Sequence, residues 1–239
     1  FPDIFCNTPG GIRIFKNTSD GITHSFQLVE SLLYSYFYSS MVNLYVSSVD
    51  VPAITDIDGD GDIDVLMYAG GSFITKAGPV YLKNIGNGTF QYTSDLIQGL
   101  GYEQHNPNNY YTMELFDVNK DGYLDIILGG NNKEITSRII WGSNLAKFDT
   151  SNQSILPPQA SYSGVVDIAF TDLEKDGDLD LILLHEINYR GFGIQILENR
   201  NNAFIDVTSS RVDVASVPNA IWTAWVRLFD LDNDGDYDL

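Results

Sequence analysis

The stretch DIDGDGDIDVLMY, residues 56–68, places five aspartates within nine positions and then runs directly into an apolar segment. Related stretches begin at three further aspartates: DVNKDGYLDIILG at Asp117, DLEKDGDLDLILL at Asp172 and DLDNDGDYDL at Asp230. The first aspartates of the four stretches are 61, 55 and 58 residues apart. A recurrence of this length indicates an array of repeated structural units or a propeller.

The residue types recur position by position in the four copies. Asp is first, fifth and ninth, Asp, Asn or Glu is third, and Gly is sixth, while the second and eighth residues are apolar or aromatic. Crowded carboxylates repel one another, so such a loop needs a compensating cation. Oxygen ligands at alternate positions, with a glycine that permits a sharp turn, suit Ca²⁺, which takes six to eight oxygens. Mg²⁺ fits less well, because it demands near-ideal octahedral geometry and usually keeps several waters.

The four acidic loops, numbered first to fourth in chain order, therefore predict three to four bound Ca²⁺ ions. A solvated acidic turn would explain a single copy, but four copies in phase favour the metal. The predicted ligands are the first, third, fifth and ninth side chains and the backbone carbonyl of the variable seventh residue. The predicted metal residues are Asp56, Asp58, Asp60, Asp62 and Asp64; Asp117, Asn119, Asp121, Tyr123 and Asp125; Asp172, Glu174, Asp176, Asp178 and Asp180; and Asp230, Asp232, Asp234, Asp236 and Asp238.

The residues that follow each loop exclude an EF-hand. An EF-hand loop requires a bidentate Glu at position 12 and lies between two helices. Here position 12 is Met67, Leu128 or Leu183, within short apolar runs that favour a buried strand over an amphipathic helix. Strand-like segments such as YTMELFDV also precede the loops, so each loop is predicted to join two strands.

A second pattern recurs at a fixed phase after the loops. The segments IRIFKNTSDG, VYLKNIGNGTF, RIIWGSNLAKF and IQILENRNNAF carry Asn17, Asn84, Gly142 and Asn199 at corresponding positions. They are typical of β-hairpins whose turns are rich in Asn and Gly. One unit is then strand, acidic loop, strand, loop, strand, tight turn, strand. Four antiparallel strands in about 60 residues is the size of a propeller blade.

These D-x-D-x-D-G-x-x-D loops, with a downstream K-N-x-G-x-G-x-F turn, resemble the FG-GAP and VCBS repeats of integrin α-subunit-like β-propellers. The resemblance covers essentially the whole chain. It implies an all-β propeller of four-stranded antiparallel blades, with Ca²⁺ loops between the first and second strands on one face and ligand-binding loops mostly on the other. Two positions depart from the pattern: Glu174 replaces the shorter Asp or Asn, and RIIWGSN lacks the Lys-Asn pair. The third loop is therefore expected to bind more weakly.

The predicted organisation is a partial blade at 1–49, repeats at 50–110, 111–164 and 165–223, and a partial repeat at 224–239. FPDIF at the start aligns with YLDII from Tyr123, and the last residue follows the ninth position of the fourth loop, so both ends fall within a loop. We interpret the chain as part of a longer propeller, of seven blades as the resemblance implies, whose remaining blades are its partners. A four-bladed ring closed by joining the two ends is the alternative.

Composition indicates the setting in which the chain works. Lys and Arg number 13 against 32 Asp and Glu, which gives a formal net charge of −19. Such an acidic surface argues against nucleic acid or an anionic membrane as a partner. The uncharged residues 31–49 contain too much Ser, Tyr and Asn for a bilayer segment, so no membrane insertion is expected. Because such loops suit the calcium concentrations found outside cells, we expect a secreted or cell-surface protein.

The sequence shows no catalytic motif. His24, His105 and His185 lie far apart, and no H-E-x-x-H, G-x-S-x-G or P-loop pattern is found. We therefore expect a non-enzymatic extracellular module for protein or glycan recognition and adhesion. The alternative is a polysaccharide-degrading enzyme, or its accessory domain, on a similar propeller, because two carboxylates for glycan cleavage can meet from distant loops.

The ligand is expected on the face opposite the acidic loops, where the second strand connects to the third and one blade to the next. Loops carry binding residues because a rigid scaffold positions them, and exposed Tyr, Trp and Arg are frequent interface anchors. The candidates on these connections are Tyr102, Tyr110, Tyr189, Arg190 and Trp222. Aromatic residues beside a strand start also fill the space between blades, which is the alternative role for each aromatic candidate.

Overall fold

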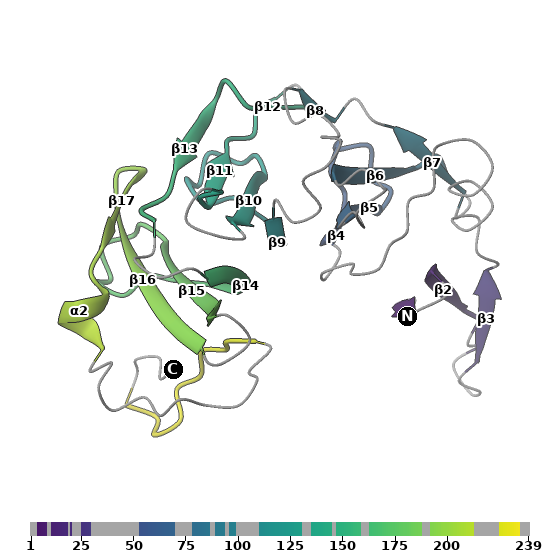
Figure 1. Cartoon of the computed structure of the whole chain (residues 1–239). Coiled ribbons are helices and arrows are strands. Elements are labelled where there is room, and N and C mark those ends of the chain that lie inside the picture. The colour runs from purple at the N-terminus through teal and green to yellow at the C-terminus, as the bar shows by residue number, and fades with distance from the viewer. Residues whose placement is uncertain are drawn as a thin grey trace. The chain divides into compact units, whose positions relative to one another are not determined.

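The computed structural model describes residues 4–8, 11–18, 20, 25–29, 53–69, 78–86, 89–93, 96–98, 110–130, 135–144, 147–158, 163–187, 192–212 and 225–234. Within these residues the chain is all-β, and the one helix is the short α2 (Thr208–Arg211) (Figure 1). The chain divides into two compact units, Phe1–Ser94 with Gly101–Pro107, and Asp95–Leu100 with Asn108–Leu239. No helix in the described part of the chain is long and apolar enough to cross a membrane.

The first unit contains two antiparallel sheets. A three-stranded sheet has its strands in chain order: β1 (Ile4–Thr8), β2 (Gly11–Asn17) and β3 (Phe26–Val29). A four-stranded sheet, also in chain order, consists of β4 (Ala53–Thr55), β5 (Asp64–Ala69), β6 (Gly78–Asn84) and β7 (Phe90–Thr93). The first acidic loop joins β4 to β5.

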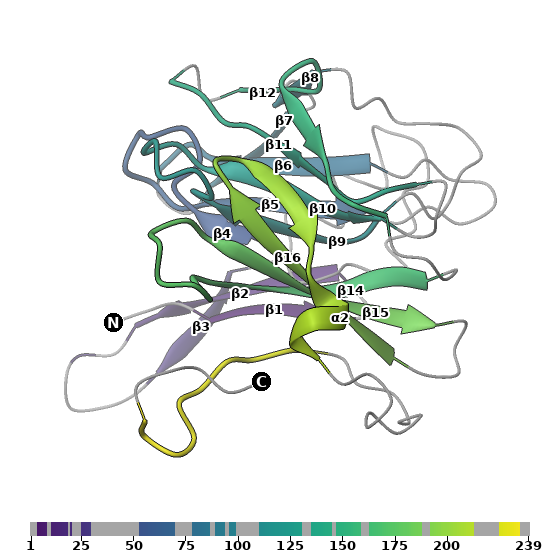
Figure 2. The same cartoon turned by 90° about the vertical axis from the view of Figure 1, so that its left-hand side faces the viewer.

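The second unit contains two further four-stranded antiparallel sheets and a two-stranded parallel one. The first consists of β9 (Tyr110–Phe116), β10 (Asp125–Gly130), β11 (Arg138–Ile140) and β13 (Gln153–Ile155). The second consists of β14 (Ser163–Thr171), β15 (Asp180–Ile187), β16 (Phe192–Arg200) and β17 (Ala203–Asp206), with α2 beside β16 (Figures 1 and 2). The parallel pair is β8 (Ile97–Gln98) with β12 (Phe148–Asp149).

The first and last four-stranded sheets have the strand order predicted for one repeat. In the second repeat, the strand predicted to complete the hairpin, at Phe148, pairs in parallel with β8 instead, and β13 is the fourth strand of the sheet. The acidic loops join β4 to β5, β9 to β10 and β14 to β15, and all three pairs are antiparallel. The residues at position 12 of these loops, Met67, Leu128 and Leu183, lie within strands. The all-β class with four-stranded antiparallel sheets is therefore confirmed, and the exclusion of an EF-hand with it.

In both four-stranded sheets of the second unit, the second strand, β10 or β15, is buried on both faces. All six residues of β10 are buried. Ile127 of β10 and Leu183 of β15 belong to one apolar cluster, while Ile182 and Leu184 of β15 belong to another with Val226. Burying a large apolar side chain contributes roughly 1.5–3 kcal/mol. These strands therefore anchor the acidic loops that lead into them.

The second and third acidic loops lie side by side. Phe116 and Phe170, which come just before the two loops, stack with their ring centroids 4.7 Å apart. Lys120 of the second loop donates a hydrogen bond to the backbone carbonyl of Gly177 in the third. The two loops are thus fixed relative to each other within this unit.

Antiparallel pairing places the acidic loop and the connection from the third strand to the fourth at one end of each four-stranded sheet, and the connection from the second strand to the third at the other end. In the last sheet, Asp180 at the end of the third loop pairs with Thr171, and Arg200 pairs with Ala203 across the tight turn. The acidic loop and the tight turn lie at the same end of the sheet, because strand direction reverses from each strand to the next. Ile187, where the connection from β15 to β16 begins, lies at the other end.

Candidate functional site

The first aspartate of each acidic loop holds the loop around its own carboxylate. Asp117 Oδ1 accepts a hydrogen bond from the backbone N–H of Asp121 at 3.0 Å, and Oδ2 accepts one from that of Gly122 at 2.9 Å. The first and third loops repeat both bonds. In the fourth loop, Asp230 accepts the corresponding bond from Asp234 at 3.1 Å. Because both oxygens are used, a carboxylate is required at this position.

Two residues with left-handed backbone give each of the first three loops its sharp turn. The sixth residues Gly61, Gly122 and Gly177 have φ of 93°, 91° and 98°. The predicted role of this glycine is therefore confirmed. The fourth residue is also left-handed, with φ between 58° and 76°, at Gly59, Lys120, Lys175 and Asn233. Sequence reasoning missed the fourth position, because lysine carries no signal for this conformation.

The ninth aspartate is buried and joins three parts of its repeat. Asp180, only 1% exposed, accepts hydrogen bonds from the backbone N–H groups of Leu173 at 2.7 Å and Asn199 at 2.8 Å, one with each oxygen. The first two loops repeat both bonds, Asp64 with Ile57 and Asn84, and Asp125 with Val118 and Gly142. The residues that recur in phase after the loops are therefore the third-strand donors to the ninth aspartate. Sequence reasoning found their phase and missed this contact.

Electrostatics differ between the loops. Burial raises the pKa of the Asp125 carboxyl to about 6, although the N–H groups of Gly142 and Val118 act in the opposite direction. In the first loop, the N–H of Asp62 and the ammonium of Lys83 lower the pKa of Asp60. Nearby positive charge favours the ionised carboxylate, and a metal ion has the same effect.

The acids at the first, third and fifth positions converge in two loops. One oxygen from each member lies within 4.8 Å of the others in the sets Asp56, Asp58 and Asp60, and Asp230, Asp232 and Asp234. Since Ca–O distances are 2.3–2.6 Å, two oxygens on one ion can lie at most about 5 Å apart. Both sets therefore fit a hard cation. Asp236 and Asp238, predicted as further ligands, lie outside the described residues.

The second and third loops differ from this arrangement at their third residue. Asn119 supplies an amide, whose Nδ2 donates to Asp121 Oδ2 at 3.0 Å. Glu174 pairs instead with Arg211 of α2. Burial and the charge of Asp180 raise the pKa of Glu174, and Arg211 acts against both. The longer side chain of Glu174 thus has an internal cation as its partner.

Comparison with known proteins identifies the family to which these loops belong. The FG-GAP-like repeat matches residues 56–128 and 117–183, which together are more than half of the chain. This chain belongs to the FG-GAP-like repeat family. No curated protein sequence matches it.

A solved structure shares the fold of this FG-GAP-like chain. It is a lectin of Agrocybe aegerita, described by its specific recognition of non-reducing terminal N-acetylglucosamine, with a TM-score of 0.53 and 18% sequence identity. The similarity covers 84% of this chain and 47% of the lectin chain, so this chain spans about half the length of that protein. The likeness supports the β-propeller class.

The first FG-GAP-like repeat brings two further side chains to its acidic loop. The ammonium of Lys83 pairs with Asp58 and, at 3.0 Å, with Asp60. The hydroxyl of Tyr81 donates to Asp64 at 2.9 Å. Sequence reasoning missed both residues, although the Lys-Asn pair of the hairpin was a usable signal for Lys83.

The predicted ligand-binding residues fall mostly outside the described part of this FG-GAP-like chain. Tyr102, Tyr189, Arg190 and Trp222 all lie outside it. Tyr110 is described, and the expectation that it is exposed is wrong. It is the first residue of β9, its side chain is only 7% exposed, and the guanidinium of Arg138 lies 5.5 Å from its ring centroid. Tyr110 therefore packs between neighbouring residues, the alternative role considered for the aromatic candidates.

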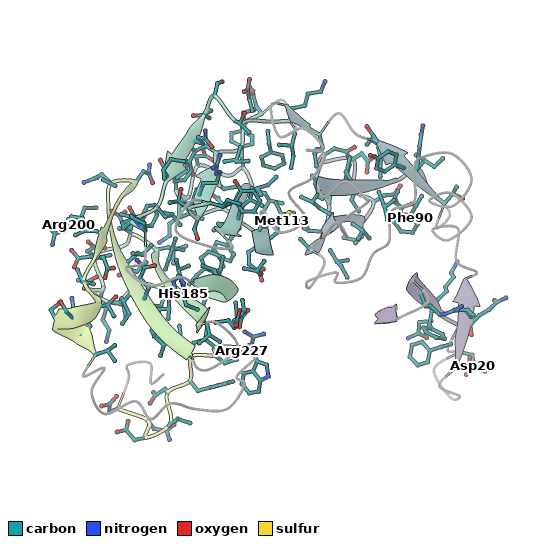
Figure 3. All side chains as sticks on the ribbon, viewed as in Figure 1. Asp20, Phe90, Met113, His185, Arg200 and Arg227 are labelled. Atoms are coloured by element: carbon teal, nitrogen blue, oxygen red, sulfur yellow. The ribbon has the colours of Figure 1, made fainter. Side chains whose placement is uncertain are left out.

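A charged cluster that includes Arg227, labelled in Figure 3, lies next to β14 in the second unit. Asp167 of β14 is buried and accepts hydrogen bonds from the backbone N–H of Val226 at 2.6 Å and from Arg227 Nη1 at 2.8 Å. Burial and the charge of Asp167 raise the pKa of Glu114 on β9 to about 7, and Arg227 acts against them. Arg227 also lies 5.8 Å from the ring centroid of Trp225. Sequence reasoning missed this cluster, because its charged members are more than fifty residues apart.

The raised pKa of Glu114 predicts a pH dependence of stability. The carboxyl binds its proton more tightly in the folded chain than in the unfolded chain, so stability falls as the pH rises from about 4.5 to about 7. Glu114→Gln removes this loss. Relative to the wild type, its free energy of unfolding is expected to rise by about 1–3 kcal/mol from pH 5 to pH 8. Urea unfolding of both proteins at the two pH values measures the gain.

A second titrating group, His185, does not affect the comparison between the wild type and Glu114→Gln. Burial lowers the pKa of His185 to about 4, so His185 makes stability fall as the pH drops from 6.5 toward 4. This contribution is present in both proteins and cancels in their difference. An equal change with pH in the wild type and in Glu114→Gln would contradict the assignment.

Proposed function

We propose that this chain is a calcium-stabilised FG-GAP-like propeller module that recognises a protein or a glycan outside the cell. The observation that carries the proposal is the loop that recurs in phase along the chain, with its acids at the first, third and fifth positions converged in two copies. A converged set of carboxylates repels itself unless a cation lies among them. Ca²⁺ is the hard cation whose oxygen preference and flexible coordination suit this set.

Within each loop the residues divide into two roles. The first, third and fifth side chains would hold the ion, with the seventh backbone carbonyl and a remaining lone pair of the ninth carboxylate. The first and ninth aspartates also accept backbone N–H groups, so they shape the loop in addition to facing the ion. When bound, Ca²⁺ would supply positive charge that offsets the repulsion between carboxylates. Its role would be structural.

Recognition would use the end of each sheet away from the acidic loops. Two features support this: antiparallel pairing separates the two ends, and the fold is shared with a glycan-recognising lectin. The candidates that remain are Tyr102, Tyr189, Arg190 and Trp222. The acidic composition and the calcium requirement support a secreted or cell-surface setting.

A glycan and protein array, read in CaCl₂ and in EDTA, tests the proposal. We expect capture of a defined ligand in calcium, and a loss of about tenfold or more on Arg190→Ala or Trp222→Ala, as for central anchors of an interface. Tyr123→Ala is the matched control, because Tyr123 is an exposed aromatic residue on an acidic loop and the substitution keeps its backbone carbonyl. Loss of capture in the control alone would place the binding site at the acidic loops and contradict the proposal.

The charged cluster of Glu114, Asp167 and Arg227 favours a second candidate, a polysaccharide-degrading enzyme. A carboxyl with a raised pKa beside an ion-paired carboxylate is an arrangement that glycosidases use for acid–base work. Digestion of plant and bacterial polysaccharides by the wild type and by Glu114→Gln tests it. Hydrolysis that is lost in the variant would establish the enzyme, and no hydrolysis by the wild type would dismiss it.

A further inference from the structure

We infer that Lys83 is a resident cation of the first acidic loop, which keeps that loop formed without Ca²⁺ and weakens its affinity for the ion. The second half of this statement rests on the proposed calcium binding, and the first half does not. The first and second loops share the same spacing of ligands, but they would differ in the source of the positive charge that offsets their carboxylates.

The geometry places the Lys83 ammonium among the converged acids. Lys83 lies on β6, and its Nζ pairs with both Asp58 and Asp60, two of the three acids whose oxygens converge. The Lys83 side chain is 35% exposed, so part of it is withdrawn from water. Tyr81, two residues earlier on the same face of β6, adds hydrogen bonds from its hydroxyl to Asp64 at 2.9 Å and to Asp58 at 3.4 Å. One side of the loop is therefore already supplied with donors and a positive charge.

The second and third repeats carry no cation at this position, whereas Lys16 precedes Asn17 in the N-terminal partial blade. Lys83 immediately precedes Asn84, the third-strand donor to the ninth aspartate. In the second repeat the equivalent residue is Trp141, whose indole N–H donates to Ser154 at 3.1 Å. In the third repeat it is Glu198, which adds a negative charge and pairs with Arg200. At this position, the first repeat therefore differs in charge from the second and third repeats.

The lysine of the second loop does not substitute for Lys83. Lys120, the fourth residue of the second loop, directs its ammonium to the backbone carbonyl of Gly177 in the third loop. That contact joins two loops without neutralising the carboxylates of its own loop. Among the described residues, no lysine or arginine pairs with a carboxylate of the second loop, whereas Lys83 pairs with two carboxylates of the first. We therefore expect the second loop to depend on an external cation.

The consequence for binding follows from the shared ligands. Ca²⁺ in the first loop would need oxygens of Asp58 and Asp60 that the ammonium already contacts, and the two cations repel each other. The uncharged, similarly long side chain in Lys83→Met is expected to raise the calcium affinity of the first loop about tenfold or more. The same change removes the internal neutralisation, so the loop becomes dependent on calcium.

Hydrogen exchange of the full chain, measured in EDTA and in CaCl₂, tests the inference. Peptide 56–69 reports on the first loop and peptide 117–130 on the second. In the wild type we expect the first peptide to exchange alike in both conditions, and the second to exchange faster in EDTA. In Lys83→Met we expect the first peptide to exchange at least about tenfold faster in EDTA and to recover in CaCl₂. Lys147→Met, which changes an exposed lysine outside the loops, is the matched control and is expected to behave as the wild type.

The outcomes separate the inference from the proposed function. If Lys83→Met leaves 56–69 protected in EDTA as in the wild type, Lys83 is not the resident cation and the inference is overturned. If Ca²⁺ protects none of the loops in any protein, the proposed function fails, while the comparison in EDTA still decides the role of Lys83. Lys83→Arg, which keeps the charge, should retain protection in EDTA, and its failure to do so would also overturn the inference.

Discussion

Asp180→Ala is expected to destabilise the chain by about 2–6 kcal/mol, because two backbone N–H groups lose their shared, buried acceptor. The carboxylate is 1% exposed and accepts the backbone N–H groups of Leu173 and Asn199 at 2.7 and 2.8 Å. Alanine leaves both donors without their acceptor in a region with little access to water, and each unsatisfied group costs about 1–3 kcal/mol. It also releases the acidic loop from the third strand.

Urea unfolding in EDTA measures this loss without a contribution from bound metal. Asp178→Ala is the matched control, because the Asp178 carboxylate accepts one exposed hydrogen bond from Asn201 at 3.1 Å. The control is expected to cost less than about 1 kcal/mol. Asp180→Asn should fall between the two, since the amide keeps one acceptor. A loss of less than 1 kcal/mol in Asp180→Ala would contradict the structural role of the ninth aspartate.

Gly142→Asn is expected to destabilise the second repeat by about 3 kcal/mol or more, although it restores the residue found in the other repeats. Asn84 and Asn199 donate from Nδ2 to the carbonyls of Ile63 and Leu179 at 3.2 and 3.1 Å. In the second repeat, the corresponding carbonyl of Leu124 lies 2.1 Å from where a Cβ on residue 142 would be. Any side chain there forces backbone to move, so no gain in hydrogen bonding can be realised.

Thermal and urea unfolding of Gly142→Asn and Gly142→Ala test this expectation together. Both variants should lose stability to a similar degree, because the clash comes from the Cβ that they share. Asn199→Gly is the reciprocal change and should cost about 2–4 kcal/mol, through the loss of two side-chain hydrogen bonds, to Leu179 and from Asn202, and through the entropy cost of a glycine in a strand. A Gly142→Asn protein as stable as the wild type would show that the close approach to Leu124 is not maintained.

The fold was predictable because its signal is local and repeated. Alternating acids with a glycine at the sixth position identify the loop, and the apolar runs that contain Leu128 and Leu183 identify the strand that follows. Repetition turned a weak local pattern into a specific one. The positions of Asn84, Gly142 and Asn199 were also visible, because they recur at a constant phase.

What the sequence could not show are contacts between residues far apart in the chain. One N–H donor to each described ninth aspartate comes from 17 to 20 residues later, in the third strand or just after its end, and only the sheet register determines this contact. Glu114 on β9 and Asp167 on β14 meet because these two first strands are neighbours, and Arg227 reaches Asp167 from the segment 225–234. Tyr110 is an aromatic residue at a strand start in the sequence, and only the structure shows that Arg138 covers it.

Calcium uptake by the chelator-stripped chain tests the central claim most directly. Isothermal titration with CaCl₂, combined with melting curves in EDTA and in calcium, is predicted to show bound Ca²⁺ and a higher melting temperature. Each occupied site adds roughly 2.7 kcal/mol of stability at a hundredfold excess over its Kd. No uptake at millimolar Ca²⁺, together with identical melting curves in EDTA and in calcium, would contradict the account.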